Sequence, residues 1–154
     1  MKLPGDAQRI QAEIESLLAV PPALPDELQG SLARYLCVLA SSYLETSCRQ
    51  LVVEYARCRS DHTVLKYVET AVSGFRDPNM EKILQLIGRF SVSLRDTVTQ
   101  QVSDKTKESV DSIYANRNSV AHGRQSGISI GQIRGYYEDA KALVVRLHAT
   151  LGLP

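Results

Sequence analysis

The sequence of 154 residues has no tryptophan, only three histidines and only three cysteines. The cysteines, Cys37, Cys48 and Cys58, are odd in number and widely spaced, which fits neither a disulfide framework nor a zinc-binding signature. On a helix, Cys37 and Cys48 would lie within about 20° of one face, so we expect both to be buried as small apolar side chains. Because no cluster of metal-ligating residues is visible, we expect neither a metal nor another cofactor.

The sequence also lacks an excess of one charge. Its 18 basic and 17 acidic residues give a net charge of +1, which excludes a non-specific polyanion binder, because such proteins are strongly basic. Any RNA-binding site must therefore depend on a local cluster of cations. No apolar run approaches the roughly 18 residues of a membrane span, and the first residues become polar before a signal-peptide core forms. We expect a cytoplasmic protein without membrane contact.

Glycine and proline are absent between Gly30 and Gly74, and such an uninterrupted stretch favours long helices. Apolar residues recur at intervals of three and four along most of the chain, whereas the alternation at 128–130 is too short to form a sheet. With 44% hydrophobic residues, the chain has enough apolar side chains for a core of normal size. The sequence predicts a single all-α domain over 1–154, an up-and-down bundle of about five to seven helices.

Capping residues and the apolar periodicity together set the expected helix boundaries. We expect helices over 6–20, 26–58, about 64–72 and 104–122, and a less regular one at 93–102. A further helix should be capped by Asp77, with Pro78 in its first turn. The last helix should begin at the Ser129–Gln132 capping box and extend to 151.

The helix over 104–122 has an arginine in its apolar stripe. The stripe comprises Thr106, Val110, Ile113, position 117 and Val120, and position 117 is Arg117. An unpaired buried charge is costly. Arg117 therefore requires a carboxylate partner, or it lines a cleft where its charge is used.

His122 ends the same helix, and Gly123 suits the position after the C-cap. The Cα atom of His122 lies about 140° around the helix and about 7.5 Å along it from that of Arg117. An Arg-x4-6-His match is expected by chance about 0.7 times in such a chain, and a second match, from Arg57 to His62, spans a predicted helix end and loop. On these residues alone, a structural ion pair at Arg117 and a helix cap at His122 remain the simpler alternative.

Three stretches of the sequence, in order, resemble one known family. They are 42–49, 116–123 and the segment from Ile128 that opens the last helix with Tyr136 and Tyr137. Together they extend the resemblance over about 31–148. The stretches are similar to HEPN domains, in particular to the RiboL-PSP type. The hallmark of HEPN domains is an Arg-x4-6-His motif near the end of a late helix, with a polar residue directly after the arginine.

The resemblance implies a helical homodimer that cleaves RNA without a metal, with two copies of the motif facing each other across the interface. In such enzymes the 2′-hydroxyl attacks the adjacent phosphate and leaves a 2′,3′-cyclic phosphate. His122 would be the general acid or base, and Arg117 would hold the scissile phosphate and stabilise its developing charge. Asn118 would position the arginine, the histidine or the phosphate, and Asn116 would support the site. An antitoxin or another regulatory protein is a further possible partner.

Three other residues are candidates for supporting roles. Glu45 and Arg49 are spaced i,i+4, so they form either a surface salt bridge or a site element in which Glu45 neutralises Arg117; Glu45 is the partner that we expect for Arg117. Arg124 occupies the position where one branch of HEPN toxins has a tyrosine that is AMPylated, so that modification is not expected here. Arg124 is either a solvated loop residue or a contact to RNA phosphates. The alternative function is a non-catalytic helical module that binds a nucleotide or a protein.

Overall fold

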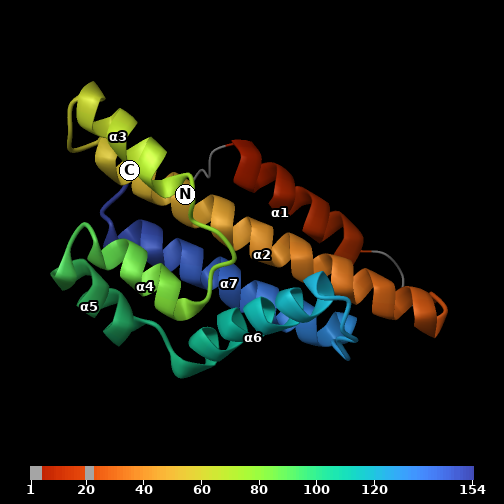
Figure 1. Cartoon of the computed structure of the whole chain (residues 1–154). Coiled ribbons are helices and arrows are strands. Elements are labelled where there is room, and N and C mark those ends of the chain that lie inside the picture. Colours follow the sequence, from red (N-terminus) through yellow and green to blue (C-terminus); the bar gives the residue numbers. More distant parts are fainter. Residues whose placement is uncertain (1–4, 20–22) are drawn as a thin grey trace.

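The computed structural model describes residues 5–19 and 23–154, and this part of the chain consists of helices and connecting loops, without a strand (Figure 1). The predicted all-α class is therefore confirmed. Its seven helices are α1 (Gly5–Leu18), α2 (Asp26–Arg57), α3 (His62–Val72), α4 (Met80–Gly88), α5 (Val92–Gln101), α6 (Asp104–Ala121) and α7 (Ile130–Thr150). The predicted helix over 6–20 corresponds to α1, although Val20, Pro21 and Pro22 lie outside the described residues.

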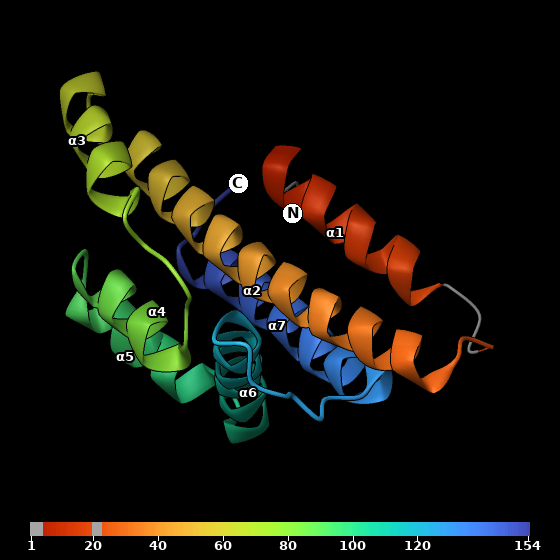
Figure 2. The ribbon, with the colours of Figure 1, turned by 45° about the vertical axis from the view of Figure 1, so that its right-hand side comes forward.

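The long helix α2 is the centre of the fold. Its 32 residues extend for about 48 Å, and it packs against α1, α3, α6 and α7. Helix α7 runs in the same direction as α2 (Figures 1 and 2), and Arg59 after α2 donates to the carbonyl of Leu151 after α7 at 3.1 Å. The short helices α3, α4 and α5 return the chain to the start of α6. No helix among residues 5–19 and 23–154 is long and apolar enough to cross a membrane.

The core lies between α2, α6 and α7 and is closed by α1 and α4. Tyr43 and Tyr137 meet edge to face with ring centroids 5.6 Å apart, a favourable aromatic geometry. Cys37 and Cys48 are both buried, as predicted. Burial raises the pKa of the Cys37 thiol to about 11 and that of Cys48 to about 12, because ionisation in an apolar surrounding is unfavourable. Both thiols therefore act as neutral core residues.

Helix caps confirm several of the predicted boundaries. The Ser129 hydroxyl accepts from the backbone N–H of Gln132, whose side chain accepts from the Ser129 N–H, which completes the predicted capping box. Asp61 caps α3. Helix α6 ends at Ala121, and His122 is its C-cap.

The predicted start of α4 is wrong. Asn79, not Asp77, is its N-cap and accepts from the backbone N–H of Lys82 at 2.8 Å, so the helix begins at Met80. Asp77 lies in the preceding loop with a positive φ of 46°. Its carboxylate is used for a tertiary contact instead of a cap.

Candidate active site around Arg117

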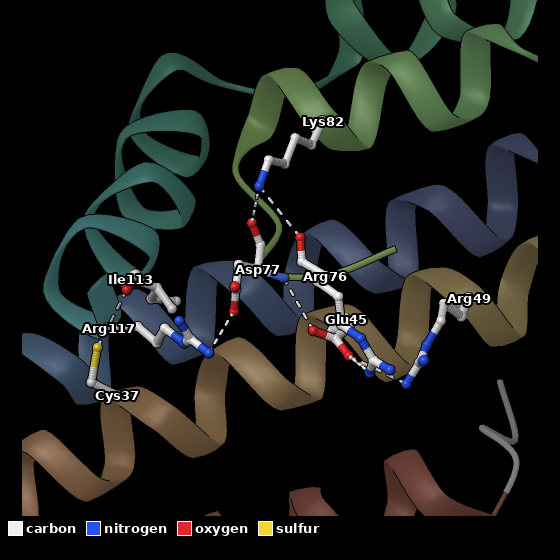
Figure 3. A network of polar contacts seen from close by, with 8 residues as sticks. All are labelled: Cys37, Glu45, Arg49, Arg76, Asp77, Lys82, Ile113 and Arg117. Carbon is white, nitrogen blue, oxygen red and sulfur yellow. Dashed lines mark hydrogen bonds and ion pairs between the residues drawn. The ribbon is translucent and has the colours of Figure 1, made fainter. Parts of the chain in front are cut away.

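Arg117 lies on α6 with its guanidinium directed at the loop between α3 and α4 (Figure 3). Its Nη2 atom is 2.9 Å from Oδ1 of Asp77, and each of the two side chains is about one-third exposed (32% and 31%). The expected ion pair between Glu45 and Arg117 is therefore wrong. The loop 73–79 places the Asp77 carboxylate against Arg117, and the carboxylate of Glu45 binds other groups.

Glu45 holds the loop in place. Its Oε1 atom accepts from Arg76 at 2.9 Å and pairs with Arg49 at 3.4 Å, which confirms the predicted i,i+4 pair. Its Oε2 atom accepts from the backbone N–H of Asp77 at 3.1 Å. Glu45 thus acts on Arg117 indirectly, through the backbone of the residue that carries the carboxylate partner.

Lys82 holds the same loop from the side of α4. Its Nζ atom donates to the backbone carbonyls of Asp77 at 3.0 Å and of Arg76 at 3.4 Å, and it lies 5.1 Å from the ring centroid of Tyr114. The left-handed backbone of Asp77 is uncommon, although aspartate tolerates it better than most residues. Contacts from α2 and α4 therefore fix the unusual conformation that presents the carboxylate to Arg117.

The cluster formed by these side chains is positively charged. Four cations, Arg49, Arg76, Lys82 and Arg117, surround two carboxylates, those of Glu45 and Asp77. The excess is two positive charges in a chain whose total net charge is +1. The cluster is therefore a local concentration of cations in an otherwise balanced chain.

The backbone behind Arg117 is fixed against α2. The Cys37 thiol donates to the carbonyl of Ile113 at 3.4 Å, which lies one helical turn before Arg117. The Ile113 side chain is fully buried. Arg117 therefore extends from a rigid turn toward a fixed loop, where one edge of its guanidinium pairs with Asp77.

His122 and Asn118 lie on another side of α6. The His122 side chain is exposed, and its backbone N–H donates to the carbonyl of Asn118 at 3.1 Å. Since the two residues are spaced i,i+4, their side chains are neighbours on one helix face. Within the described part of the chain neither side chain has a hydrogen-bond partner. Arg117 and His122 are thus both accessible, and their Cα atoms lie about 140° apart around the helix.

Asn116 makes two hydrogen bonds near the end of α6. Its side-chain amide donates to the carbonyl of Ser112 at 2.8 Å, and its Oδ1 atom accepts from the Ser126 hydroxyl at 2.6 Å. It therefore anchors the loop between α6 and α7 and makes no hydrogen bond to Arg117 or His122. Arg124, in that loop, is exposed.

The sequence alone did not reveal Asp77, Arg76 and Lys82 as site residues. The Asp77-Pro78 pair also has the form of a helix start, and this local signal concealed its tertiary role. Arg76 and Lys82 belong to no motif. Only an unpaired arginine in the stripe of α6 indicated that a carboxylate had to lie nearby.

A comparison of the sequence with models of protein families identifies the family of this chain. The RiboL-PSP-HEPN family model matches residues 6–152. The chain belongs to the RiboL-PSP-HEPN family. The matched range of this HEPN domain includes α1 to α7 and every residue of the Arg117 cluster. Neither the search of curated proteins nor the search of solved structures yields a match.

The position of Arg117 and His122 in the fold can be compared with that of the second Arg-x4-6-His match. In this RiboL-PSP-HEPN chain the Arg-x4-6-His motif occupies the last turns of α6, which is the second-last helix. The second Arg-x4-6-His match begins at the last residue of α2 and ends at the first residue of α3. Arg57 is paired with Glu54, and a loop separates it from His62. We therefore interpret this second match as a chance occurrence of the motif.

Proposed function

We propose that this HEPN protein is a metal-independent endoribonuclease that leaves a 2′,3′-cyclic phosphate. The observation that carries the proposal is the Arg117 guanidinium, held part-exposed by Asp77 within a cluster of net positive charge. A guanidinium fixed in this way is suited to a phosphate, because it has five N–H donors and Asp77 engages only one edge. The accessible His122 at the end of the same helix supplies an imidazole that can act as general acid or base.

In the proposed reaction His122 of one copy removes the proton of the RNA 2′-hydroxyl. The 2′-oxygen then attacks the adjacent phosphorus, the bond from phosphorus to the 5′-oxygen breaks, and the leaving oxygen takes a proton from water or from the protonated His122 of the other copy. Arg117 stabilises the negative charge that grows on the non-bridging oxygens. Asn118, one turn before His122, orients the imidazole.

The direction of the two side chains supports a site shared between two copies of the chain. Within one copy Arg117 faces the loop 73–79 (Figure 3), and the Cα atom of His122 lies about 140° around α6 from that of Arg117. Two copies that meet along α6 would bring the histidine of each toward the arginine of the other. The proposal therefore includes a homodimer in the cytoplasm, with RNA as substrate and an antitoxin or other regulatory protein as a possible partner.

A non-catalytic binding module is the second candidate, and one observation favours it. The guanidinium of Arg117 already has a carboxylate partner, so the cluster is also complete as a structural ion pair. In that case the positive cluster would bind a nucleotide or an acidic protein segment without any chemical step.

The deciding experiment compares wild type with His122→Ala and Arg117→Gln on labelled tRNA and mRNA in the presence of EDTA. We expect wild type to cut and both variants to lose most of this activity, with products that carry a 2′,3′-cyclic phosphate. The control is His62→Ala, which alters the histidine of the second Arg-x4-6-His match. If wild type and His122→Ala cut equally, or neither cuts any RNA, the nuclease proposal fails.

A further inference from the structure

A cavity of about 450 Å³ lies beside the end of α6, between the first half of α2 and the loop that joins α6 to α7. In Figure 2 this loop runs in front of the ribbon from the end of α6 to the start of α7. The lining residues are Arg34, Val120, Gly123, Arg124, Gln125, Ser126 and Gly127. Two arginines from segments far apart in the sequence therefore border one cavity, and among the described residues no carboxylate lines it.

The loop wall offers further hydrogen-bond donors. The backbone N–H groups of Gln125, Ser126 and Gly127 have no acceptor among residues 5–19 and 23–154, whereas those of Gly123 and Arg124 close the end of α6. Arginine side chains and free backbone N–H groups are the donors that proteins use for phosphate oxygens. No carboxylate among the described residues that line the cavity competes for these donors, so the cavity is chemically matched to a phosphate.

The loop is also held in shape. Ser126 is bonded to Asn116 of α6 at 2.6 Å, and Gly123 begins the loop with a φ of +66°, which favours glycine. The Arg34 guanidinium donates to the Ser31 hydroxyl at 3.1 Å and has no carboxylate partner among the described residues. The loop and Arg34 are thus held before any ligand arrives, which reduces the entropic cost of binding.

We propose that the cavity between Arg34 and Arg124 binds a phosphodiester of single-stranded RNA that flanks the scissile one. This inference rests on the proposed nuclease function and extends its site. Gly123 follows His122 directly, and its Cα lies about 9 Å along the helix axis from that of Arg117. A strand whose scissile phosphate lies near Arg117 or His122 would place a neighbouring phosphate at this cavity. The subsite would fix the register of the strand without reading its bases.

The test measures RNA binding separately from cleavage. Fluorescence anisotropy of a labelled single-stranded RNA is recorded over a range of salt concentrations with His122→Ala protein and with the same protein carrying Arg34→Gln, Arg124→Gln or both. Each phosphate contact to a single strand contributes about 0.7 to the slope of log affinity against log salt. We expect each substitution to weaken binding and the double variant to lower the slope measurably.

Arg146→Gln is the matched control, because Arg146 is an exposed arginine of α7 that lines a separate cavity. It removes the same charge, and we expect no change in slope. If the double variant has the slope of the control, the subsite is refuted. In the cleaving protein, Arg34→Gln and Arg124→Gln should raise KM more than they lower kcat. If the wild type cleaves RNA but the double variant has an unchanged slope, the subsite alone is refuted. If the wild type binds RNA in a way that depends on Arg34 but never cuts it, the subsite is supported and the nuclease function is refuted.

Discussion

The Nη2 atom of Arg117 lies 2.9 Å from Oδ1 of Asp77, a residue whose backbone adopts a positive φ of 46° in the loop before α4. The pair joins the arginine of the Arg-x4-6-His motif to a loop that α2 and α4 hold in place through Glu45 and Lys82. Asp77 is therefore a positioning residue for the guanidinium.

The first prediction concerns this pair. Asn tolerates a positive φ as Asp does, so Asp77→Asn removes the charge and leaves the loop conformation accessible. We expect kcat to fall about tenfold, equivalent to about 1.4 kcal/mol, with a smaller change in KM, because the guanidinium loses its fixed direction. Asp96→Asn is the control, since Asp96 forms an exposed ion pair with Arg95 on α5 at 2.8 Å. An unchanged kcat in Asp77→Asn would show that the pair does not position Arg117.

The second prediction separates function from stability at Arg117. Its guanidinium is about one-third exposed, so Arg117→Ala should change the free energy of unfolding by about 1 kcal/mol or less, as partly exposed pairs do. Ile113→Ala, one turn earlier and fully buried, should cost about 2–5 kcal/mol. Urea denaturation of both variants provides the comparison. A loss of several kcal/mol in Arg117→Ala would favour a purely structural role.

The third prediction concerns Glu45, whose carboxylate binds two arginines and the N–H of Asp77 while only 15% exposed. Glu45→Gln weakens all three contacts, and we expect a loss of about 1–3 kcal/mol in the free energy of unfolding. Amide hydrogen exchange over 73–79 should accelerate. Glu81→Gln is the control, because Glu81 is exposed and bonded only to Gln85 nearby. Equal exchange over 73–79 in both variants would contradict the role given to Glu45.

The fourth prediction is a loss of stability at alkaline pH. Burial raises the pKa of Cys37 to about 11 and of Cys48 and Tyr43 to about 12. An unfolded cysteine ionises near pH 8.5 and an unfolded tyrosine near about pH 10. The folded state therefore holds these protons more tightly, and its stability is full below about pH 8.5 and falls as the pH rises toward the folded values.

This dependence is checked by measuring the free energy of unfolding from pH 7 to about pH 10.5. Cys48→Ala should give a shallower fall, because one buried thiol no longer contributes. Cys58→Ala is the matched control, since Cys58 is exposed. A flat curve for wild type, or an identical slope in Cys48→Ala, would argue against this origin of the alkaline sensitivity.

Local sequence signals predicted most of the fold. The run without glycine or proline after Gly30 gave α2, the Ser129 capping box gave the start of α7, and Gly123 gave the end of α6. These features depend on residues within one or two turns, so they can be inferred without the tertiary structure. The burial of Cys37 and Cys48 followed from helical periodicity in the same way.

The environment of Arg117 was only half predicted. Its place in the stripe of α6 indicated that a carboxylate partner or a cleft was required, but the choice of Glu45 was wrong. Asp77 and Arg117 are 40 residues apart in the sequence, and no periodicity links a loop residue to a helix face. Glu45 and Lys82 hold the backbone of the loop where Asp77 meets Arg117.

The sequence by itself thus determined the helices, the capping box of α7, the end of α6 and the presence of a charged residue that required a partner or a cleft. The tertiary structure decided which carboxylate pairs with Arg117, that Asn116 anchors a loop, and that Arg34 and Arg124 border one cavity. The reason is physical. Helix periodicity and capping act over a few residues, whereas ion pairs and cavities depend on the packing of α2, α4 and α6, which joins residues far apart in the chain.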